Sequence, residues 1–244
     1  MIRRILRGAG IRSSYGAMGA GSVTLVEDQG KRILIDVGHY GNRDQLRVAI
    51  SGAGLKTENV DYVVLTHVHW DHCLNVDLFN RSEILVHEKE FNMGTLSGVK
   101  DLPTESFKAF LKSMNLRLIS KDGYELTRNV RTIDTFGHAP GHMSVVVEDP
   151  GGTVVVSGDA LPNLRALRRG LPDFIFYDEV MARRSIERIR KMRPHTIFPG
   201  HDSPFNEEGY IETDEVDIRL RETGENDLIV RIVRTLAEKP IKPA

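Results

Sequence analysis

Residues 66–72 read Thr66-His67-Val68-His69-Trp70-Asp71-His72, which places three imidazoles and one carboxylate within seven positions. The preceding run, Val60-Asp61-Tyr62-Val63-Val64-Leu65, predicts a buried strand whose C-terminal end carries the cluster on a loop. Side chains alternate along an extended segment, so His67, His69 and Asp71 can point one way. His72 then points away from them, and one short loop could serve two adjacent metal ions. Imidazole nitrogen and carboxylate oxygen are ligands that zinc binds, so the cluster indicates a metal site. The alternative interpretation of the cluster is a chance run of solvated histidines.

The composition sets the outer limits. A chain of 244 residues with 40% hydrophobic content can bury a substantial core, and we expect one α/β domain over residues 1–244. The 33 basic and 34 acidic residues nearly cancel, so no overall field attracts nucleic acid or an anionic membrane. The single cysteine, Cys73, excludes an intramolecular disulfide and is typical of a reducing compartment, so we expect a cytoplasmic location. No apolar stretch approaches the roughly 18 residues of a membrane span.

Hydrophobic periodicity predicts the elements around this loop. Strands are expected at residues 2–6, 22–27, 32–37, 60–65, 83–86, 124–127, 130–135, 143–148, 153–157 and 196–198. Helices are expected at residues 43–53, after Pro103, at 180–192 and at about 227–239. The last of these has an apolar face of Leu228, Ile229, Ile232, Val233 and Leu236, and Pro240 ends it.

Three more loops follow apolar strands and pair a polar residue with glycine. They are Gly137-His138-Ala139-Pro140-Gly141-His142, Ser157-Gly158-Asp159-Ala160 and Phe198-Pro199-Gly200-His201-Asp202. Glycine lets the backbone turn sharply and approach closely. Together with the first cluster, and with His142 and Asp202 left aside, these loops supply five histidines and two aspartates at strand ends. That is enough for two three-ligand sites that share a bridging carboxylate.

This ordered set resembles the metallo-β-lactamase superfamily from about Ser22 to Phe205. The resemblance implies a four-layer αββα sandwich with the site at one edge of the paired sheets. It also implies that a first metal ion is held by His67, His69 and His138, and a second by Asp71, His72 and His201. Asp159 and a water or hydroxide would bridge the two ions. Two Zn²⁺ ions are expected, although iron or manganese also occurs in the superfamily.

The expected chemistry follows from a pair of ions. Two divalent cations lower the pKa of a shared water toward 7, so a hydroxide nucleophile exists at neutral pH. Asp71 would be the catalytic residue, because it could orient that water and carry a proton toward the leaving group. We therefore expect a dinuclear zinc hydrolase that acts on small esters, lactones or phosphoesters. A homodimer is an option that the sequence leaves open.

Other activities are implied by other branches of the superfamily. The chain is similar to quorum-quenching lactonases, many of which contact the substrate through a tyrosine shortly after the bridging aspartate. Here that segment is Ala160-Leu161-Pro162-Asn163. The chain also looks like single-domain proteins linked to RNA cleavage, so an RNA endonuclease is the second hypothesis. An iron-dependent persulfide dioxygenase is the third, although such enzymes usually lack a full second metal site.

The remaining candidates have less specific patterns. We interpret His142 as a supporting residue, Cys73 as a small buried filler, and Asp36 and Asp202 as braces of the ligand loops. The arginines from Arg165 to Arg190 could form an anion clamp, but a solvated helix face paired with acidic residues is the preferred interpretation. Residues 162–177, with Phe174, Phe176 and Tyr177, could form a lid over the substrate.

Overall fold

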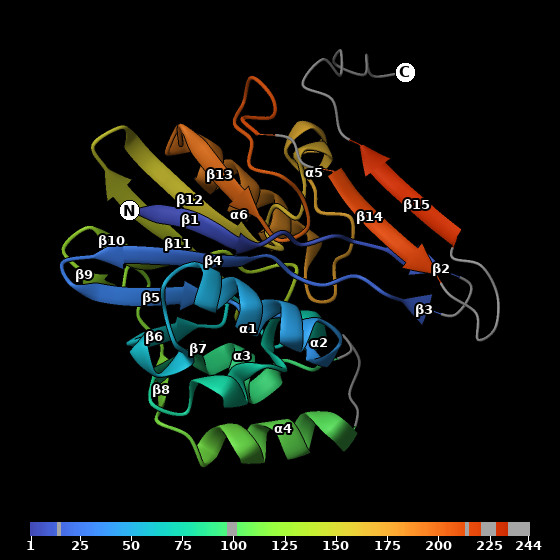
Figure 1. Ribbon diagram of the computed structural model, residues 1–244. Helices are drawn as coiled ribbons and strands as arrows, with labels where there is room; N and C mark the ends of the chain where they lie inside the picture. The colour runs from blue at the N-terminus through green and yellow to red at the C-terminus, as the bar shows by residue number, and fades with distance from the viewer. Residues whose placement is uncertain (14–15, 97–101, 213–214, 221–227, 234–244) are drawn as a thin grey trace.

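The structure is a computed structural model that describes residues 1–13, 16–96, 102–212, 215–220 and 228–233. Two β-sheets lie face to face, and helices cover the outer face of each (Figure 1). The arrangement is the four-layer αββα sandwich that the sequence predicted. Among the described residues, no helix has the length and apolar character needed to cross a membrane.

The first sheet has six strands in the order β1-β4-β5-β6-β7-β8. These strands are β1 (Ile2–Leu6), β4 (Val23–Asp28), β5 (Lys31–Ile35), β6 (Tyr62–Val64), β7 (Glu83–His87) and β8 (Leu116–Ile119). Pairs β1/β4 and β4/β5 are antiparallel, and the pairs from β5 to β8 are parallel. Strands β4 and β5 join through Gln29 and Gly30, whose φ angles of 49° and 75° match the tight turn that the sequence predicted.

The second sheet has five strands in the order β13-β12-β11-β10-β9. These are β9 (Glu125–Thr127), β10 (Val130–Asp134), β11 (Met143–Asp149), β12 (Gly152–Gly158) and β13 (Thr196–Pro199). Only the pair β12/β13 is parallel. The ends of β6, β10, β12 and β13 all lead into the loops that carry the predicted ligands.

Consecutive residues of the central strands pack into different layers, which explains why these strands are almost entirely apolar. On β6, Val63 packs under the helices of the first sheet, whereas Val64 packs between the sheets. On β12, Val155 packs under the helices of the second sheet, whereas Val154 and Val156 lie between the sheets. Three apolar layers therefore hold the sandwich together.

The helices divide between the two outer faces. The first sheet is covered by α1 (Arg43–Gly52), α2 (Trp70–Cys73), α3 (Glu88–Met93) and α4 (Leu102–Lys112), with the 3₁₀ turns η1 (Tyr40–Asn42), η2 (Thr57–Asn59) and η3 (Val76–Phe79). The second sheet is covered by α5 (Leu164–Arg169) and α6 (Glu179–Lys191). The sequence predicted α1, α4 and α6 but missed α3, α5 and β8, which are too short for a helical or strand period to emerge.

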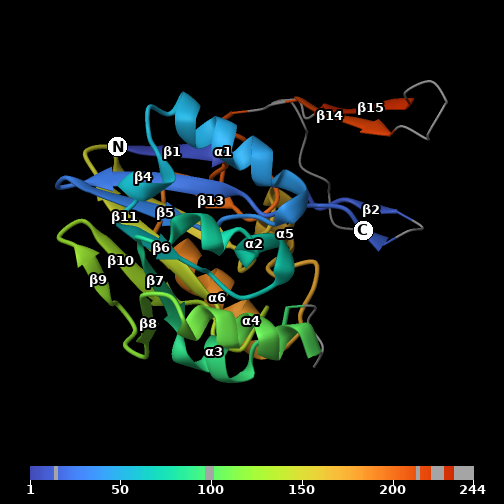
Figure 2. The ribbon, with the colours of Figure 1, turned by 60° about the horizontal axis from the view of Figure 1, so that its bottom comes forward.

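Two small hairpins extend beyond the sandwich on the same side in both views (Figures 1 and 2). They are β2 (Arg12–Ser13) with β3 (Gly16–Ala17), and β14 (Glu215–Leu220) with β15 (Leu228–Val233). The prediction of a helix at about 227–239 is wrong where the structure describes it, because 228–233 form β15. Four of these six residues are β-branched, and the register aligns Ile218 with Val230 and Val216 with Ile232. Residues 227 and 234–239 lie outside the described residues.

The two sheets are also linked by a polar contact at the end of the β4–β5 hairpin. Asp28 accepts hydrogen bonds from Thr127 Oγ1 and from Asn129 Nδ2, the latter at 3.0 Å. Burial raises the pKa of Asp28, but these hydrogen bonds outweigh it and hold the pKa below 3.8. Because the folded pKa is depressed, the stabilisation is present above pH 3.8 and is lost as the pH falls through the folded value.

Replacement of this carboxylate should therefore have a pH-dependent effect. We expect Asp28→Asn to lower the free energy of unfolding by about 1–2 kcal/mol at pH 7, since a charge-assisted link between the sheets is lost. The difference from the parent protein should shrink as the pH falls below 4, as measured by urea unfolding at a series of pH values. Thr127→Val should cause part of the same loss. Equal stability of Asp28→Asn and the parent at pH 7 would contradict this role.

Candidate metal centre

The predicted ligand residues arrive from four strand ends. The loop 66–72 follows β6, His138 follows β10, Asp159 follows β12, and His201 follows β13. The His201 loop approaches the Asp159 loop most closely at Gly200, where a Cβ atom would lie 2.0 Å from Asp159 Oδ1. Only glycine therefore allows the His201 loop to lie against the Asp159 loop.

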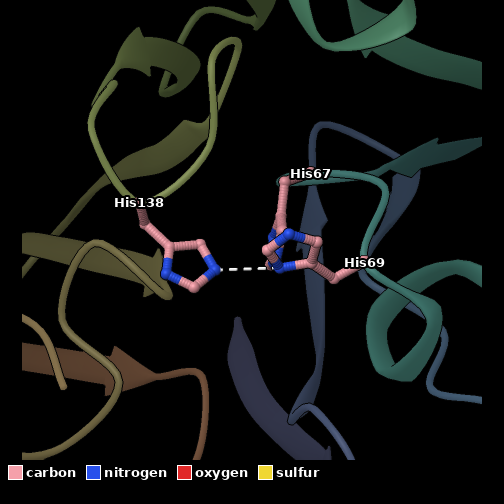
Figure 3. Close-up of side chains that lie close together, drawn as sticks. All are labelled: His67, His69 and His138. Carbon is pink, nitrogen blue, oxygen red and sulfur yellow. Dashed lines mark hydrogen bonds between the residues drawn. The ribbon is translucent and has the colours of Figure 1, made fainter. Parts of the chain in front are cut away.

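Three buried histidines form the first group (Figure 3). His69 Nδ1 lies 2.9 Å from His67 Nε2 and 3.0 Å from His138 Nε2. His67 and His69 come from the first sheet, whereas His138 comes from the second. The group therefore spans the joint between the two sheets.

A second group lies beside the first and consists of Asp71, His72 and His201. His201 Nε2 lies 3.3 Å from His72 Nε2 and 3.4 Å from Asp71 Oδ2. Asp159 lies between the groups, since Oδ2 is 3.5 Å from His138 Nε2 and Oδ1 is 3.2 Å from His201 Nε2. The structure thus brings all seven predicted residues together, and their roles as ligands remain a prediction.

Hydrogen bonds on the far side of the rings orient two of the histidines. His138 Nδ1 donates to Phe174 O at 2.8 Å, and His201 Nδ1 donates to Ala20 O at 3.1 Å. Because a carbonyl oxygen can only accept, Nδ1 carries the proton in each neutral ring. The unprotonated Nε2 of each ring then faces the centre, which is the form that binds a metal ion.

Asp36 orients His67 and His72 from the end of β5. It accepts hydrogen bonds from His72 Nδ1 and Thr66 Oγ1, both at 2.8 Å, and from Thr66 N at 2.8 Å. The Thr66 hydroxyl gives its proton to Asp36, so it accepts from His67 Nδ1 at 3.0 Å. The prediction that Asp36 braces a ligand loop is confirmed. Thr66 was not predicted, because its role depends on two contacts that only the fold creates.

The centre combines opposing electrostatic effects. Burial and then the neighbouring imidazoles hold the pKa values of His67 and His69 well below 6.5. Burial also lowers the pKa of His72, but Asp159, Asp71 and Asp36 outweigh it and raise the pKa to about 10. Burial raises the pKa of Asp159, but His201, His72 and His138 outweigh it and hold the pKa well below 3.8. Without a bound cation, protons on the imidazoles must therefore balance the carboxylates.

The residues at this centre fit a divalent cation. The Nε2 atoms of His67 and His138 carry no proton, and both face His69 Nδ1 at hydrogen-bond distance, although one ring nitrogen can donate to at most one of them. Asp159 Oδ1 is buried, and its contacts at 3.2 Å with His201 Nε2 and at 3.5 Å with His72 Nε2 lack the geometry of a hydrogen bond. Buried polar atoms normally have a partner, and a metal ion supplies one for nitrogen and oxygen ligands alike.

A cavity of about 600 Å³ opens above the two groups. Its floor includes His69, Asp71, His138, Asp159 and His201, and its apolar wall includes Trp70, Leu96, Phe174 and Phe176. The Phe176 ring lies 4.8 Å from the His69 ring. Residues Phe174 and Phe176 thus line the site as expected for the predicted lid segment.

The other candidates also have defined places. His142 accepts a hydrogen bond from Asp159 N at 3.0 Å, so it supports the Asp159 loop as predicted. Cys73 is fully buried, in agreement with its interpretation as a filler. On α6, Arg183 pairs with Glu179, as the solvated-face interpretation expects. Glu90 was missed, although it contacts two ligand loops, because no spacing relates it to the histidines.

Comparisons with known proteins agree with this geometry. The family model described as "Metallo-beta-lactamase superfamily" matches residues 16–201. The chain is 28% identical over 165 residues to an N-acyl homoserine lactonase from Bacillus cereus, a match that covers 65% of this chain and 62% of the lactonase. It is 30% identical over 191 residues to metallo-beta-lactamase domain-containing protein 1 from Xenopus laevis, covering 76% of this chain and 72% of that protein.

A solved structure shares the fold. The crystal structure of a metallo-beta-lactamase homologue from Thermotoga maritima superposes with a TM-score of 0.66. The match covers 84% of this chain and 98% of that one, at 24% sequence identity. At this identity the likeness shows the fold alone.

The electrostatics of the centre predict that metal binding releases protons. His72 has a pKa of about 10, so at pH 8 it carries a proton that a metal ion must displace. We expect titration of metal-stripped protein with Zn²⁺ to release about one proton or more per chain, and the affinity to fall as the pH is lowered. Calorimetry in two buffers with different ionisation enthalpies measures this release.

A control variant separates the centre from the other histidines. His195→Ala should release as many protons as the parent, because His195 is partly exposed and pairs with Asp149 away from the centre. Heats of Zn²⁺ binding that do not depend on the buffer would contradict the predicted charge state of His72.

Proposed function

Because this chain belongs to the metallo-β-lactamase superfamily, we propose that it is a metal-dependent hydrolase with two Zn²⁺ ions that cleaves small esters, lactones or phosphoesters. One observation carries the proposal: seven imidazole and carboxylate side chains converge, and five of them line a cavity of about 600 Å³. Cavities of this size and apolar lining bind small molecules. The donor set of nitrogen and oxygen atoms suits zinc.

The ligand assignment follows the two groups. His67, His69 and His138 would hold the first ion, Asp71, His72 and His201 the second, and Asp159 would contact both. Bound there, the cations would act as Lewis acids and lower the pKa of a water molecule. The hydrogen bonds from the far side of His67, His72, His138 and His201 keep the rings oriented before a substrate arrives.

Asp71 is the proposed proton carrier. Its carboxylate lines the cavity, and its side chain is 16% exposed, so it can reach both a water molecule and a leaving group there. A carboxylate within hydrogen-bond distance of a reacting group can accept a proton in one step and return it in the next. Asp159 is less suited to this task because it is more deeply placed between the two groups of ligands.

The walls of the cavity favour a substrate with an apolar part. Phe174 and Phe176 stack with ring centres 6.3 Å apart beside the ligands. Asn163 also lines the cavity, but its Oδ1 accepts from Ala166 N and its Nδ2 donates to Asp173. The side chain of Asn163 is therefore engaged within the protein, and the ligand groups themselves must orient the polar end of the substrate.

Cleavage of RNA has less support than cleavage of a small molecule. Nucleic-acid binding requires a basic surface that contacts several phosphates. The net charge of this chain is −1, and three of the four arginines of α6 take part in ion pairs: Arg183 with Glu179, Arg188 with Asp122 and Arg190 with Glu207. Arg165 lines the cavity, but it pairs with Asp173.

A panel of substrates tests the proposal. The purified protein should contain close to two zinc ions per chain and hydrolyse at least one compound among lactones, thioesters, aryl esters and aryl phosphoesters. His69→Ala should reduce turnover to the uncatalysed rate, because the first group loses a central nitrogen. His195→Ala is the matched control and should retain full activity.

Three outcomes would overturn the proposal. Turnover of short single-stranded RNA alone would reject the small-molecule assignment. Full activity in a preparation without metal would reject the metal-dependent mechanism. An iron-loaded preparation that consumes oxygen without hydrolysing any ester would indicate redox chemistry instead.

A further inference from the structure

Glu90 joins the two loops that carry the first group of histidines. It lies on α3, is 1% exposed, and accepts hydrogen bonds from two backbone amides. Oε1 accepts from Val68 N at 3.0 Å, and Oε2 accepts from Gly141 N at 2.9 Å. Val68 lies between His67 and His69, and Gly141 lies three residues after His138.

The packing around this carboxylate is tight. A Cβ atom at Gly141 would lie 2.1 Å from Glu90 N, and a Cβ atom at Gly94 would lie 2.4 Å from Glu90 Oε1. Both glycines therefore allow the backbone to approach Glu90 from either side. The backbone around Glu90 is therefore closely packed on both sides.

A carboxylate in this place is costly to bury. Among the described residues, Glu90 forms no salt bridge, so the two amides are its hydrogen-bonding compensation. Burial raises the pKa of Glu90 to about 7, and the two amides and the charge of Lys108 act against this increase. Burial of a carboxylate usually destabilises a protein, so its presence at the joint between two ligand loops indicates a role there. Two oxygens on one rigid group can hold two donors at a set separation, which a neutral side chain of this size cannot do.

We propose that Glu90 is a positioning residue that sets the separation of the His67–His69 loop and the His138 loop, and thereby the affinity of the first metal site. The inference rests on the ligand assignment of the proposed function. The second site has supports that do not involve Glu90, from Asp36 to His72 and from Ala20 to His201. Loss of Glu90 should therefore weaken one ion and leave the other in place.

The variant Glu90→Gln tests this role with little change in shape. Glutamine offers one acceptor oxygen and one amide group, and that amide would face a backbone N–H instead of accepting from it. One of the two loops is then released. We expect the affinity for one of two Zn²⁺ ions to fall about ten- to hundredfold, the effect typical of residues that orient metal ligands.

The measurement is chelator competition with the full-length protein, together with urea unfolding of the same samples. Ser82→Ala is the matched control, because Ser82 is fully buried and donates to Val60 O at 2.7 Å away from the ligand loops. Ser82→Ala should lose stability yet bind both ions like the parent. Replacing zinc by Co²⁺ should also show a changed absorption spectrum for one ion in Glu90→Gln only.

The outcomes separate this inference from the proposed function. If the parent binds two ions and Glu90→Gln binds both with unchanged affinity, the positioning role is wrong and the proposed function stands. If the parent binds no metal, the proposed function itself fails. Should Glu90→Gln not fold, Glu90→Asp gives the same test, because it withdraws both oxygens by one methylene. Unchanged affinity in Glu90→Asp would then overturn the inference.

Discussion

The structure depends on holding five histidines and two aspartates together at the edge of the sandwich, where buried imidazoles crowd one another. Unprotonated nitrogens of His67 and His138 face His69 at about 3 Å. Because these rings are buried, water does not screen the electrostatic interactions between them. Only rigid supports behind the rings can maintain such a cluster. Asp36, Thr66 and the backbone carbonyls of Ala20 and Phe174 provide them, so the orientation of the ligands is determined before any ion binds.

The two-sheet architecture explains how these supports meet. The first sheet brings the loop 66–72, and the second brings His138, Asp159 and His201, while a shared apolar layer fixes one sheet on the other. Glycines at the loop bases then allow approaches that a Cβ would prevent, as at Gly200 and Gly141. In this account Glu90 belongs to the same system, because it connects the loops of the two sheets directly.

Much of this was predictable from the sequence, for physical reasons. The central strands are buried on both faces, so they are recognised in the sequence as apolar runs. The predicted ligands directly follow these runs in the sequence. Glu90 and Thr66 could not be identified, because their roles arise from contacts between distant segments. The prediction of a helix at Leu228–Val233 was wrong. An apolar stretch this short is compatible with the periodicity of a helix and of a strand, and here the segment forms a strand because it pairs with β14. The single domain, the homodimer and the compartment stay predictions.

The central claim is that this cluster binds two metal ions. It is tested most directly by anomalous X-ray diffraction, at the zinc absorption edge, from crystals of the zinc-loaded protein. We expect two peaks, one about 2 Å from nitrogens of His67, His69 and His138, and one at a similar distance from Asp71, His72 and His201. Asp159 should lie between the peaks. A map without a peak among these seven side chains would show that the cluster does not bind metal ions.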